Sequence, residues 1–330
     1  MFETSHWIDG HGRAHVYLRI SVTDRCNLRC RYCMPEEGLE WVEREEILAF
    51  EEVVRLAGIF HDRGVEKIRF TGGEPLARKD LPTLVAMVHG RCPRASLHMT
   101  TNAVHLDRHV RALRSAGLEG LNVSLDSLDP DTYAEIVRRD RFESAWRGIE
   151  AAKKLGFEPL KINCVVLRGV NDREVADFVA LTRDRDIEVR FLEYMPYGDA
   201  NTLQPEYVSG EETRERIEAA GYRLERLPYE GGPARTYRVP GHAGTVGFIT
   251  SVSHHFCDDC DRLRLTADGH FVNCLYGPKR CDLKPLLRGG ASDEEIAAAI
   301  QEELNRKWAE HPDLTDGEIP VLGTMSQIGG

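Results

Sequence analysis

Short apolar runs alternate with longer amphipathic stretches along about the first 195 residues of this 330-residue chain. The apolar runs are rich in Val, Ile, Leu and Phe, which is typical of parallel strands buried on both faces. The expected strands are Val16–Val22, Lys67–Thr71, Ser96–Thr101, Leu121–Leu125, Leu160–Leu167 and Glu188–Tyr194. The expected helices are Arg44–Arg63, Asp80–Arg91, Asp107–Ala116, Phe142–Leu155 and Glu174–Arg185. This alternation predicts an α/β fold with a partial (β/α)6 barrel, and a doubly wound sheet is the alternative.

The pattern changes after Pro196, so we expect two domains, residues 1–196 and 197–330. The polar segment Tyr197–Gly210 contains Gly and Pro and is typical of a linker. The remainder predicts a small C-terminal α+β extension. Its expected elements are helices at Glu211–Ala220 and Asp293–Trp308 and strands at Arg235–Val239, Val246–Thr250, Arg262–Thr266 and His270–Val272.

Composition excludes several classes of protein. The chain is 42% apolar and 29% charged, as in ordinary globular proteins, and it has no apolar run of 18 residues. Residues 1–12 lack the pattern of a secretory signal peptide. The net charge of −11 argues against a general nucleic-acid or membrane-surface binder. We therefore expect a cytoplasmic protein whose anionic ligands meet a local cluster of positive charge.

Three of the nine cysteines follow the first expected strand in a C-x3-C-x2-C array, Cys26, Cys30 and Cys33. A loop at the carboxyl end of a barrel strand is where catalytic groups of such folds lie. Three thiolates can bind three irons of a 4Fe–4S cluster and leave the fourth iron open for a small ligand. A structural zinc site or buried thiols are the alternatives, but zinc needs four ligands and no fourth is evident nearby.

The segment Thr71-Gly72-Gly73-Glu74-Pro75 follows the second expected strand. Its glycines allow a ligand to approach the backbone closely, and the Glu74 carboxylate is an acceptor for an ammonium group. Together with the cysteine array and the aromatic Tyr32 inside it, this segment resembles the radical S-adenosylmethionine (SAM) superfamily. That resemblance implies that the first cluster binds SAM and that the Gly-Gly-Glu-Pro turn receives its methionine amino group.

A second group of cysteines lies in the C-terminal extension, where Cys257 and Cys260 form a C-x2-C pair and Cys274 follows. A structural zinc ribbon is one interpretation of this spacing. Its fourth ligand would come from His254, His255 or Cys281. The neighbouring sequence favours a functional site, because Arg262 and Arg264 alternate on an expected strand and so point to the same face.

Cations also interrupt the apolar strands of the expected barrel, at Arg19, Arg69, Lys161 and Arg190. Burying a charge without a partner is costly. A surface edge strand or an internal ion pair would explain any one of these cations, but four on different strands favour convergence on an anionic ligand. With the two C-terminal arginines, these side chains predict a positive cavity. Guanidinium groups match phosphate geometry, so the cavity suits a polyphosphate.

From about Tyr17 to Gly330 the chain resembles the GTP 3′,8-cyclase family of molybdenum cofactor biosynthesis. The resemblance implies two 4Fe–4S clusters, a SAM-binding one on Cys26, Cys30 and Cys33 and a substrate-binding one on Cys257, Cys260 and Cys274. The implied SAM contacts are Tyr32, Gly73, Ser124 and Met195. The implied GTP contacts are Arg19, Arg69, Thr100, Lys161, Arg262 and Arg264, with Arg190 as an additional candidate. The C-terminal Gly329 and Gly330 are implied to reach into the active site.

The same resemblance implies the chemistry and the partners. A 5′-deoxyadenosyl radical removes a hydrogen atom from C3′ of GTP, C3′ bonds to C8, and the product radical is reduced and protonated. The product is (8S)-3′,8-cyclo-7,8-dihydroguanosine 5′-triphosphate, formed in the first step of the pathway. The family suggests a homodimer, an unidentified one-electron donor, and transfer of the product to cyclic pyranopterin monophosphate synthase. No nucleic-acid or membrane partner is expected.

Two other functions are compatible with part of this sequence. A peptide-modifying radical SAM maturase usually carries seven or more C-terminal cysteines, and this chain has four after residue 250. A non-catalytic iron–sulfur or zinc scaffold needs neither the glycine turn nor the cations. The chain departs from the family at Ala103, where Gly is usual, and Cys92, Cys164 and Cys281 are expected to be packing or surface thiols.

Overall fold

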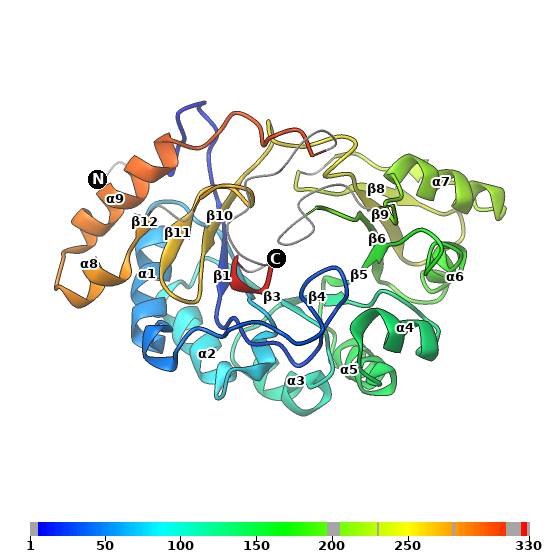
Figure 1. Ribbon diagram of the computed structural model, residues 1–330, viewed down its shortest axis with the longest axis horizontal. Helices are drawn as coiled ribbons and strands as arrows, with labels where there is room; N and C mark the ends of the chain where they lie inside the picture. The colour runs from blue at the N-terminus through cyan, green and yellow to red at the C-terminus, as the bar shows by residue number, and fades with distance from the viewer. Residues whose placement is uncertain (1–5, 197–204, 230, 279–280, 315–324, 329–330) are drawn as a thin grey trace.

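The computed structural model describes residues 6–196, 205–229, 231–278, 281–314 and 325–328. In these residues twelve strands form one sheet, in the order β12-β11-β10-β1-β2-β3-β4-β5-β6-β9-β8-β7. The six central strands are β1 (Tyr17–Ser21), β2 (Lys67–Thr71), β3 (Ser96–Thr101), β4 (Gly120–Ser124), β5 (Leu160–Val166) and β6 (Glu188–Glu193). They are parallel and curl into an open barrel (Figure 1). The predicted α/β partial barrel is confirmed, with all six strands.

Helices cover the outer face of the curled sheet (Figure 1). They are α1 (Phe50–Asp62), α2 (Leu81–Arg91), α3 (Leu106–Ser115), α4 (Pro130–Val137), α5 (Phe142–Lys154) and α6 (Val175–Ala180). The prediction of one helix over Arg44–Arg63 was wrong at its start, because a single 3-10 turn, Arg44–Glu46, precedes an extended break at Ile47. The short helix α4 was not predicted; it begins after Asp129, whose carboxylate accepts a hydrogen bond from the Thr132 amide at 2.8 Å.

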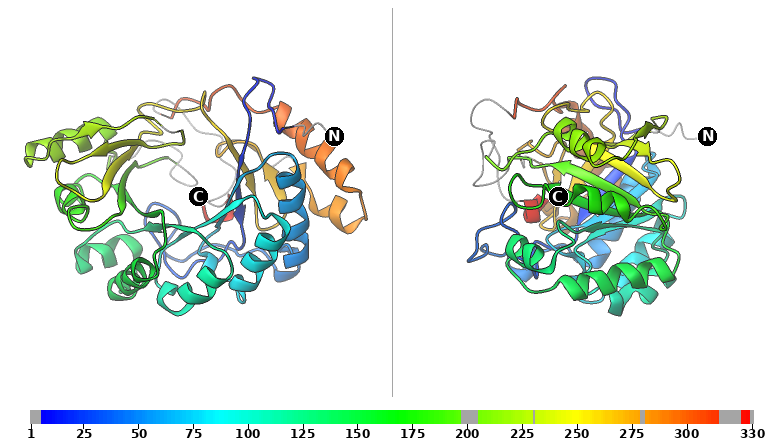
Figure 2. Two further views of the ribbon diagram at one scale, coloured as in Figure 1. Left: turned by 180° about the vertical axis from the view of Figure 1, so that it is seen from behind. Right: turned by 90° about the vertical axis from the view of Figure 1, so that its right-hand side faces the viewer.

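The C-terminal segment adds strands to both edges of the barrel sheet. On one side β10 (Arg262–Leu265) lies parallel to β1 and continues antiparallel into β11 (His270–Val272) and β12 (Cys281–Asp282). On the other, β9 (Thr245–Ile249) lies parallel to β6 and continues into β8 (Arg235–Arg238) and β7 (Glu225–Arg226). These two arms stand on opposite sides of the barrel opening (Figure 2). The domain boundary at residue 196 stays a prediction, and strands from both sides of it share one sheet.

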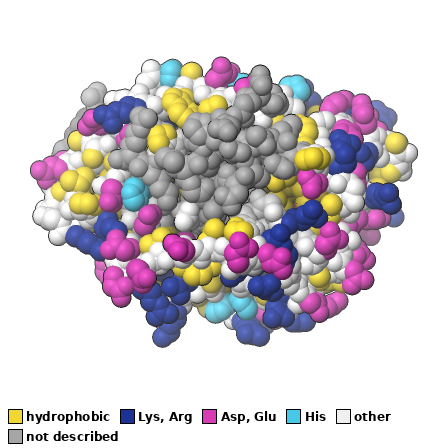
Figure 3. Space-filling view, viewed as in Figure 1, with side chains coloured by type: hydrophobic (Ala, Val, Ile, Leu, Met, Phe, Trp, Pro, Cys, Tyr) yellow, Lys and Arg dark blue, Asp and Glu magenta, His cyan; other side chains and the backbone are white. Residues whose placement is uncertain are grey.

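The remaining helices are α7 (Gly210–Ala219), α8 (Lys284–Arg288), α9 (Asp293–Asn305) and α10 (Met325–Ile328). Acidic and basic side chains are interspersed around the rim of the face shown in Figure 3. None of the helices in the described ranges is long and apolar enough to cross a membrane.

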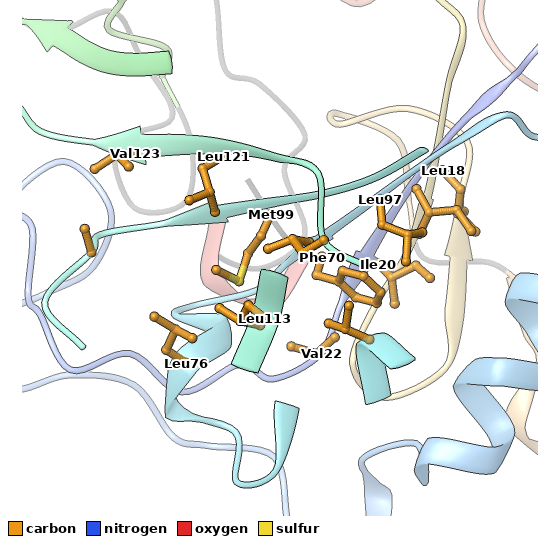
Figure 4. Packing of buried hydrophobic residues seen from close by; sticks show 14 of the residues in the cluster. Leu18, Ile20, Val22, Phe70, Leu76, Leu97, Met99, Leu113, Leu121 and Val123 are labelled. Atoms are coloured by element: carbon orange, nitrogen blue, oxygen red, sulfur yellow. The ribbon is translucent and has the colours of Figure 1, made fainter. Parts of the chain in front are cut away.

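Strand alternation separates the core from the site. Even-numbered positions such as Leu18, Ile20 and Phe70 point outward and pack under the helices (Figure 4). All three are fully buried, and each such side chain contributes about 1.5–3 kcal/mol through burial. The odd-numbered residues between them, including Arg19 and Arg69, point to the opposite face, inside the barrel.

Candidate functional site

A cavity of about 950 Å³ occupies the inside of the barrel and extends to the C-terminal arms. Side chains from β1 to β6, β9 and β10 line it. Every predicted site residue within the described ranges is among them: Arg19, Cys26, Cys30, Tyr32, Cys33, Arg69, Gly73, Thr100, Ser124, Lys161, Arg190, Met195, Cys257, Cys260, Arg262, Arg264 and Cys274. The structure therefore brings together residues that are up to 255 positions apart in the sequence (19 to 274).

Gly329 and Gly330, predicted to reach into the site, lie outside the described residues. The short helix immediately before them, α10, lies at the centre of the molecule (Figure 1). Its Met325 and Ser326 line the cavity.

The first cysteine group lies on the loop that follows β1. The loop is held by its own backbone, since the Cys33 amide donates to the Cys30 carbonyl at 2.9 Å. The Sγ atom of Cys26 accepts a hydrogen bond from the Leu28 amide at 3.4 Å. Burial raises the pKa of Cys26 to about 11 and that of Cys33 to about 12. Negative charge on Glu74 raises the pKa of Cys26 further, and negative charge on Cys26 does the same for Cys33. All three thiols line the cavity, and the Leu28 amide donates to one of their sulfur atoms. Three thiols on one loop fit the iron–sulfur cluster implied by the sequence.

The backbone of the Gly72–Gly73 turn packs directly against the backbone of the cysteine loop, with no room for a side chain between them. A side chain on Gly73 would place its Cβ 2.5 Å from the carbonyl oxygens of Asp24 and Arg25. Gly72 has a φ of 140°, which side-chain-bearing residues rarely adopt. The two glycines therefore bring the turn against the cysteine loop.

The Glu74 side chain lines the cavity and is also held by hydrogen bonds within the chain. Its carboxylate accepts hydrogen bonds from the Leu76 amide at 3.0 Å, the Thr101 hydroxyl at 2.7 Å and the Asn102 amide at 2.7 Å. Burial raises the pKa of Glu74 to about 6. Because these donors belong to the chain itself, the carboxylate anchors the turn to the end of β3, and its role as an acceptor for a ligand ammonium stays a prediction.

Tyr32 is fixed by a carboxylate that the sequence interpretation had not assigned to the site. Its hydroxyl donates to Asp126 Oδ2 at 2.6 Å, while the Val165 amide donates to Asp126 Oδ1 at 2.9 Å. Burial raises the pKa of Asp126 to about 6. Asp126 is the second residue after β4. A carboxylate at the carboxyl end of a barrel strand is a feature that could have identified it from the sequence.

The second cysteine group lies before β10 and after β11, at the end of β10 that is in register with the start of β1. Arg13 holds its loop, with Nη1 donating to the Cys257 carbonyl at 2.8 Å. Although burial opposes it, the Arg262 guanidinium and the Lys307 ammonium lower the pKa of Cys260. The Arg262 Nη2 atom lies 3.9 Å from the Cys260 sulfur. A cationic partner of this kind stabilises a thiolate ligand.

The residues considered as zinc ligands lie elsewhere. Within the part of the chain that the structure describes, His254, His255 and Cys281 are not among the side chains that line the cavity. His255 pairs with Glu310 at 3.1 Å, and the Cys281 thiol lies 3.8 Å from the Ala299 carbonyl. No three His, Cys, Asp or Glu side chains of the described ranges converge as a single metal ion requires.

The cations form a row across in-register strands. Arg19 on β1 lies opposite Arg264 on β10 and opposite Arg69 on β2. Arg69 and Arg264 are only 3% and 6% exposed. Burial lowers the pKa of Arg19, and the nearby Arg69 and Arg262 act in the same direction. So much buried positive charge is stable only with anionic groups close by.

One such group is Glu188, which the sequence interpretation missed. Its carboxylate binds Lys161 Nζ at 2.5 Å and accepts from Arg190 Nε at 2.7 Å and Nη2 at 3.1 Å. Gly247 on β9 makes room for this cluster, since a Cβ there would lie 2.9 Å from Glu188 Oε1 and 3.2 Å from Arg190 Cγ. The Glu-Val-Arg alternation on β6 was the available signal. The same alternation on β2 would have found Lys67, which lies two residues before Arg69 and also lines the cavity.

Comparison with protein families matches residues 20–182 to the radical SAM superfamily and residues 187–312 to the family described as Molybdenum Cofactor Synthesis C. The chain is 44% identical to "GTP 3′,8-cyclase" of Heliobacterium modesticaldum over 98% of its own length and all of that protein. It is 42% identical to "GTP 3′,8-cyclase, mitochondrial" of Arabidopsis thaliana, covering 83% of that protein.

A longer animal protein is also similar. The chain is 45% identical to "Molybdenum cofactor biosynthesis protein 1" of Mus musculus over 93% of its own length, and it spans 48% of the length of that protein. Among solved structures, Streptococcus suis SuiB bound to S-adenosylmethionine superposes with a TM-score of 0.54 at 16% identity, over 87% of this chain and 69% of SuiB. At that identity the likeness shows the fold alone.

Proposed function

The chain belongs to the GTP 3′,8-cyclase family of the radical SAM superfamily, and we propose from that membership and the cavity that it cyclises GTP. The product is (8S)-3′,8-cyclo-7,8-dihydroguanosine 5′-triphosphate, formed at the first step of molybdenum cofactor biosynthesis. The observation that carries the proposal is the single cavity lined by both cysteine groups and by the row of strand cations. A scaffold protein would need no such row.

Cys26, Cys30 and Cys33 would hold the first 4Fe–4S cluster, with SAM beside Tyr32, Gly73, Ser124 and Met195. Cys257, Cys260 and Cys274 would hold the second, with the guanine of the substrate. When bound, the first cluster and SAM supply one-electron chemistry that removes a hydrogen atom from the substrate.

The protein's own residues bind and orient the nucleotide. Arg19, Arg69, Arg262 and Arg264 lie on three adjacent strands and provide guanidinium groups for the triphosphate. The strands hold these arginines within the barrel, and a triphosphate bound to them would orient the ribose relative to the first cluster. The reaction isomerises GTP, since a C3′–C8 bond forms and the hydrogen lost from C3′ is balanced when the product radical takes up an electron and a proton.

Several partners belong to the same proposal. They are an external one-electron donor, a second copy of the chain in a homodimer, and cyclic pyranopterin monophosphate synthase as the enzyme that takes the product. The C-terminal Gly329–Gly330 reaching into the cavity is part of it as well, and α10 at the cavity wall supports that placement.

The proposal is tested with Arg262→Ala and Arg264→Ala. Both variants should lose GTP turnover and keep the iron content and the substrate-independent cleavage of SAM. Arg288→Ala is the matched control, because Arg288 is 43% exposed and pairs with Glu52 outside the cavity. Wild-type turnover of GTP in either cavity variant would remove that arginine from the site.

A further inference from the structure

Tyr17 is the first residue of β1, and its side chain lies among the cations of the cavity. It is 8% exposed and lines the cavity. Its hydroxyl oxygen accepts a hydrogen bond from Arg69 Nε at 2.5 Å and another from Arg19 Nη1 at 3.3 Å. The Lys67 ammonium lies 5.2 Å from the centre of its ring. No sequence feature had marked this tyrosine as part of the site.

Among the described residues, the charged groups with the largest effect on the Tyr17 hydroxyl are positive. Arg19 comes from β1, and Lys67 and Arg69 come from β2. From the β10 side, Arg262 lies in register with Tyr17, and the Cys260 thiol and the Asp261 carboxylate act on that guanidinium group. Asp261 meets Tyr17 through the backbone, where its carbonyl accepts the Tyr17 amide at 3.2 Å.

The Tyr17 hydroxyl oxygen acts as a hydrogen-bond acceptor in both of its hydrogen bonds. Both are received from guanidinium groups, and no acceptor within the described ranges takes the phenol's own proton. An oxygen that receives two charged donors is placed as a phosphate oxygen would be. The same oxygen orients Arg19 and Arg69 relative to each other, although their like charges repel.

We propose that Tyr17 is a positioning residue for the phosphate end of the cavity, which holds Arg19 and Arg69 in the empty site and takes up a proton when a polyphosphate binds them. This inference rests on the proposed function only in placing the triphosphate against these two arginines. The chemical class of the ligand is a polyphosphate, whether or not a nucleoside is attached to it.

The electrostatics give the sign of the effect. Although burial opposes it, Arg69, Arg19 and Lys67 lower the pKa of Tyr17 to about 7. The empty site therefore holds a phenolate above pH 7, and an incoming polyanion raises the pKa again. Binding takes up one proton, so affinity falls as pH rises. Between pH 7.5 and 8.5 the dissociation constant for GTP, whose terminal phosphate is already largely ionised at these pH values, should increase roughly eightfold.

The test measures binding of inorganic tripolyphosphate and of GTP to the anaerobic, cluster-loaded protein by calorimetry at pH 7.5, 8.0 and 8.5. Measurements in two buffers of different ionisation enthalpy give the number of protons taken up. With GTP we expect nearly one proton at pH 8.0 for the wild type and for Tyr222→Phe, whose tyrosine does not line the cavity. For Tyr17→Phe we expect no proton uptake, no pH dependence over this window, and a KM for GTP raised severalfold with a smaller change in kcat. With tripolyphosphate, which itself loses a proton in this range, the uptake assigned to Tyr17 is the difference between the wild type and Tyr17→Phe.

Wild-type binding without proton uptake would overturn the inference, and so would unchanged uptake in Tyr17→Phe. If Tyr17→Phe fails to fold, the wild-type measurement alone still decides. The two proposals fail separately, because proton-coupled binding of tripolyphosphate without cyclised GTP would support the role of Tyr17 and reject the proposed reaction.

Discussion

The ion cluster of Lys161, Glu188 and Arg190 provides the sharpest test of how the cavity balances its charge. The side chains of these residues are 18%, 12% and 13% exposed, so water screens them little. Glu188→Gln keeps the shape of the side chain and removes its charge. The variant leaves two buried cations without their shared carboxylate.

The expected loss of stability follows from this geometry. Removing one partner of a buried ion pair costs about 3–5 kcal/mol. The glutamine amide oxygen still accepts one hydrogen bond, which recovers about 1 kcal/mol. We therefore expect Glu188→Gln to lower the free energy of unfolding by about 2–4 kcal/mol in the absence of nucleotide.

A polyphosphate should reverse part of this loss, because it supplies the missing negative charge. GTP at one hundred times its dissociation constant stabilises the wild-type protein by about 2.7 kcal/mol. In Glu188→Gln we expect about 1.4 kcal/mol more at the same concentration, which corresponds to tenfold tighter binding. Substrate affinity would thus improve in a less stable protein.

The assay is urea unfolding of the anaerobic, cluster-loaded protein with and without GTP. Glu135→Gln is the matched control, since Glu135 pairs with Arg31 at 3.0 Å but is 65% exposed, and such pairs contribute about 0–1 kcal/mol. The reasoning is refuted if Glu188→Gln is as stable as Glu135→Gln and gains no extra stabilisation from GTP.

Two further predictions concern the glycine turn and a buried histidine. Gly73→Ala should abolish SAM binding, because the new Cβ would meet two backbone carbonyl oxygens. Gly90→Ala is the control, since a Cβ there has nothing within 4 Å, and it should bind SAM normally in equilibrium dialysis. Equal SAM binding by both variants would contradict the packing argument. Burial, with Arg69, Lys67 and Lys161 nearby, lowers the pKa of His98 to about 3, so His98 contributes stability that is fully present above pH 6.5 and is lost on acidification. Between pH 6.5 and 5 the free energy of unfolding, measured in urea titrations, should fall by about 2 kcal/mol because of His98. His98→Gln should remove this pH dependence. An unchanged pH dependence in that variant would show that His98 is not the group responsible.

Local patterns predicted most of the fold. The six barrel strands alternate with helices, and their apolar runs could be identified from the local sequence alone. The start of the first helix was wrong because residues 44–49 have helix-forming side chains, while in the structure Leu48 is buried and its amide donates to the Ala267 carbonyl at 2.9 Å. That contact crosses more than 200 residues and has no local signature.

The same reason limits what could be predicted about the site. The cysteines and strand cations were identifiable because their residue types are unusual at those positions. The sequence predicted that Arg262 and Arg264 join the barrel cations in one cavity, but it did not indicate how. The pairing of β10 with β1 and of β9 with β6 is long-range and has no local signature. Tyr17 and Glu188 were missed because a tyrosine or a glutamate at the start of a strand is ordinary. Their significance arises only from the cations that the fold places around them.

Product analysis tests the central claim most directly. The anaerobically reconstituted protein is incubated with SAM, dithionite and GTP, with ATP as the control nucleotide, and the mixture is examined by mass spectrometry. We predict 5′-deoxyadenosine together with a new species of the same mass as GTP, and no corresponding isomer of ATP. Absence of the GTP isomer, from protein shown to hold its iron and to cleave SAM, would contradict the proposed cyclisation.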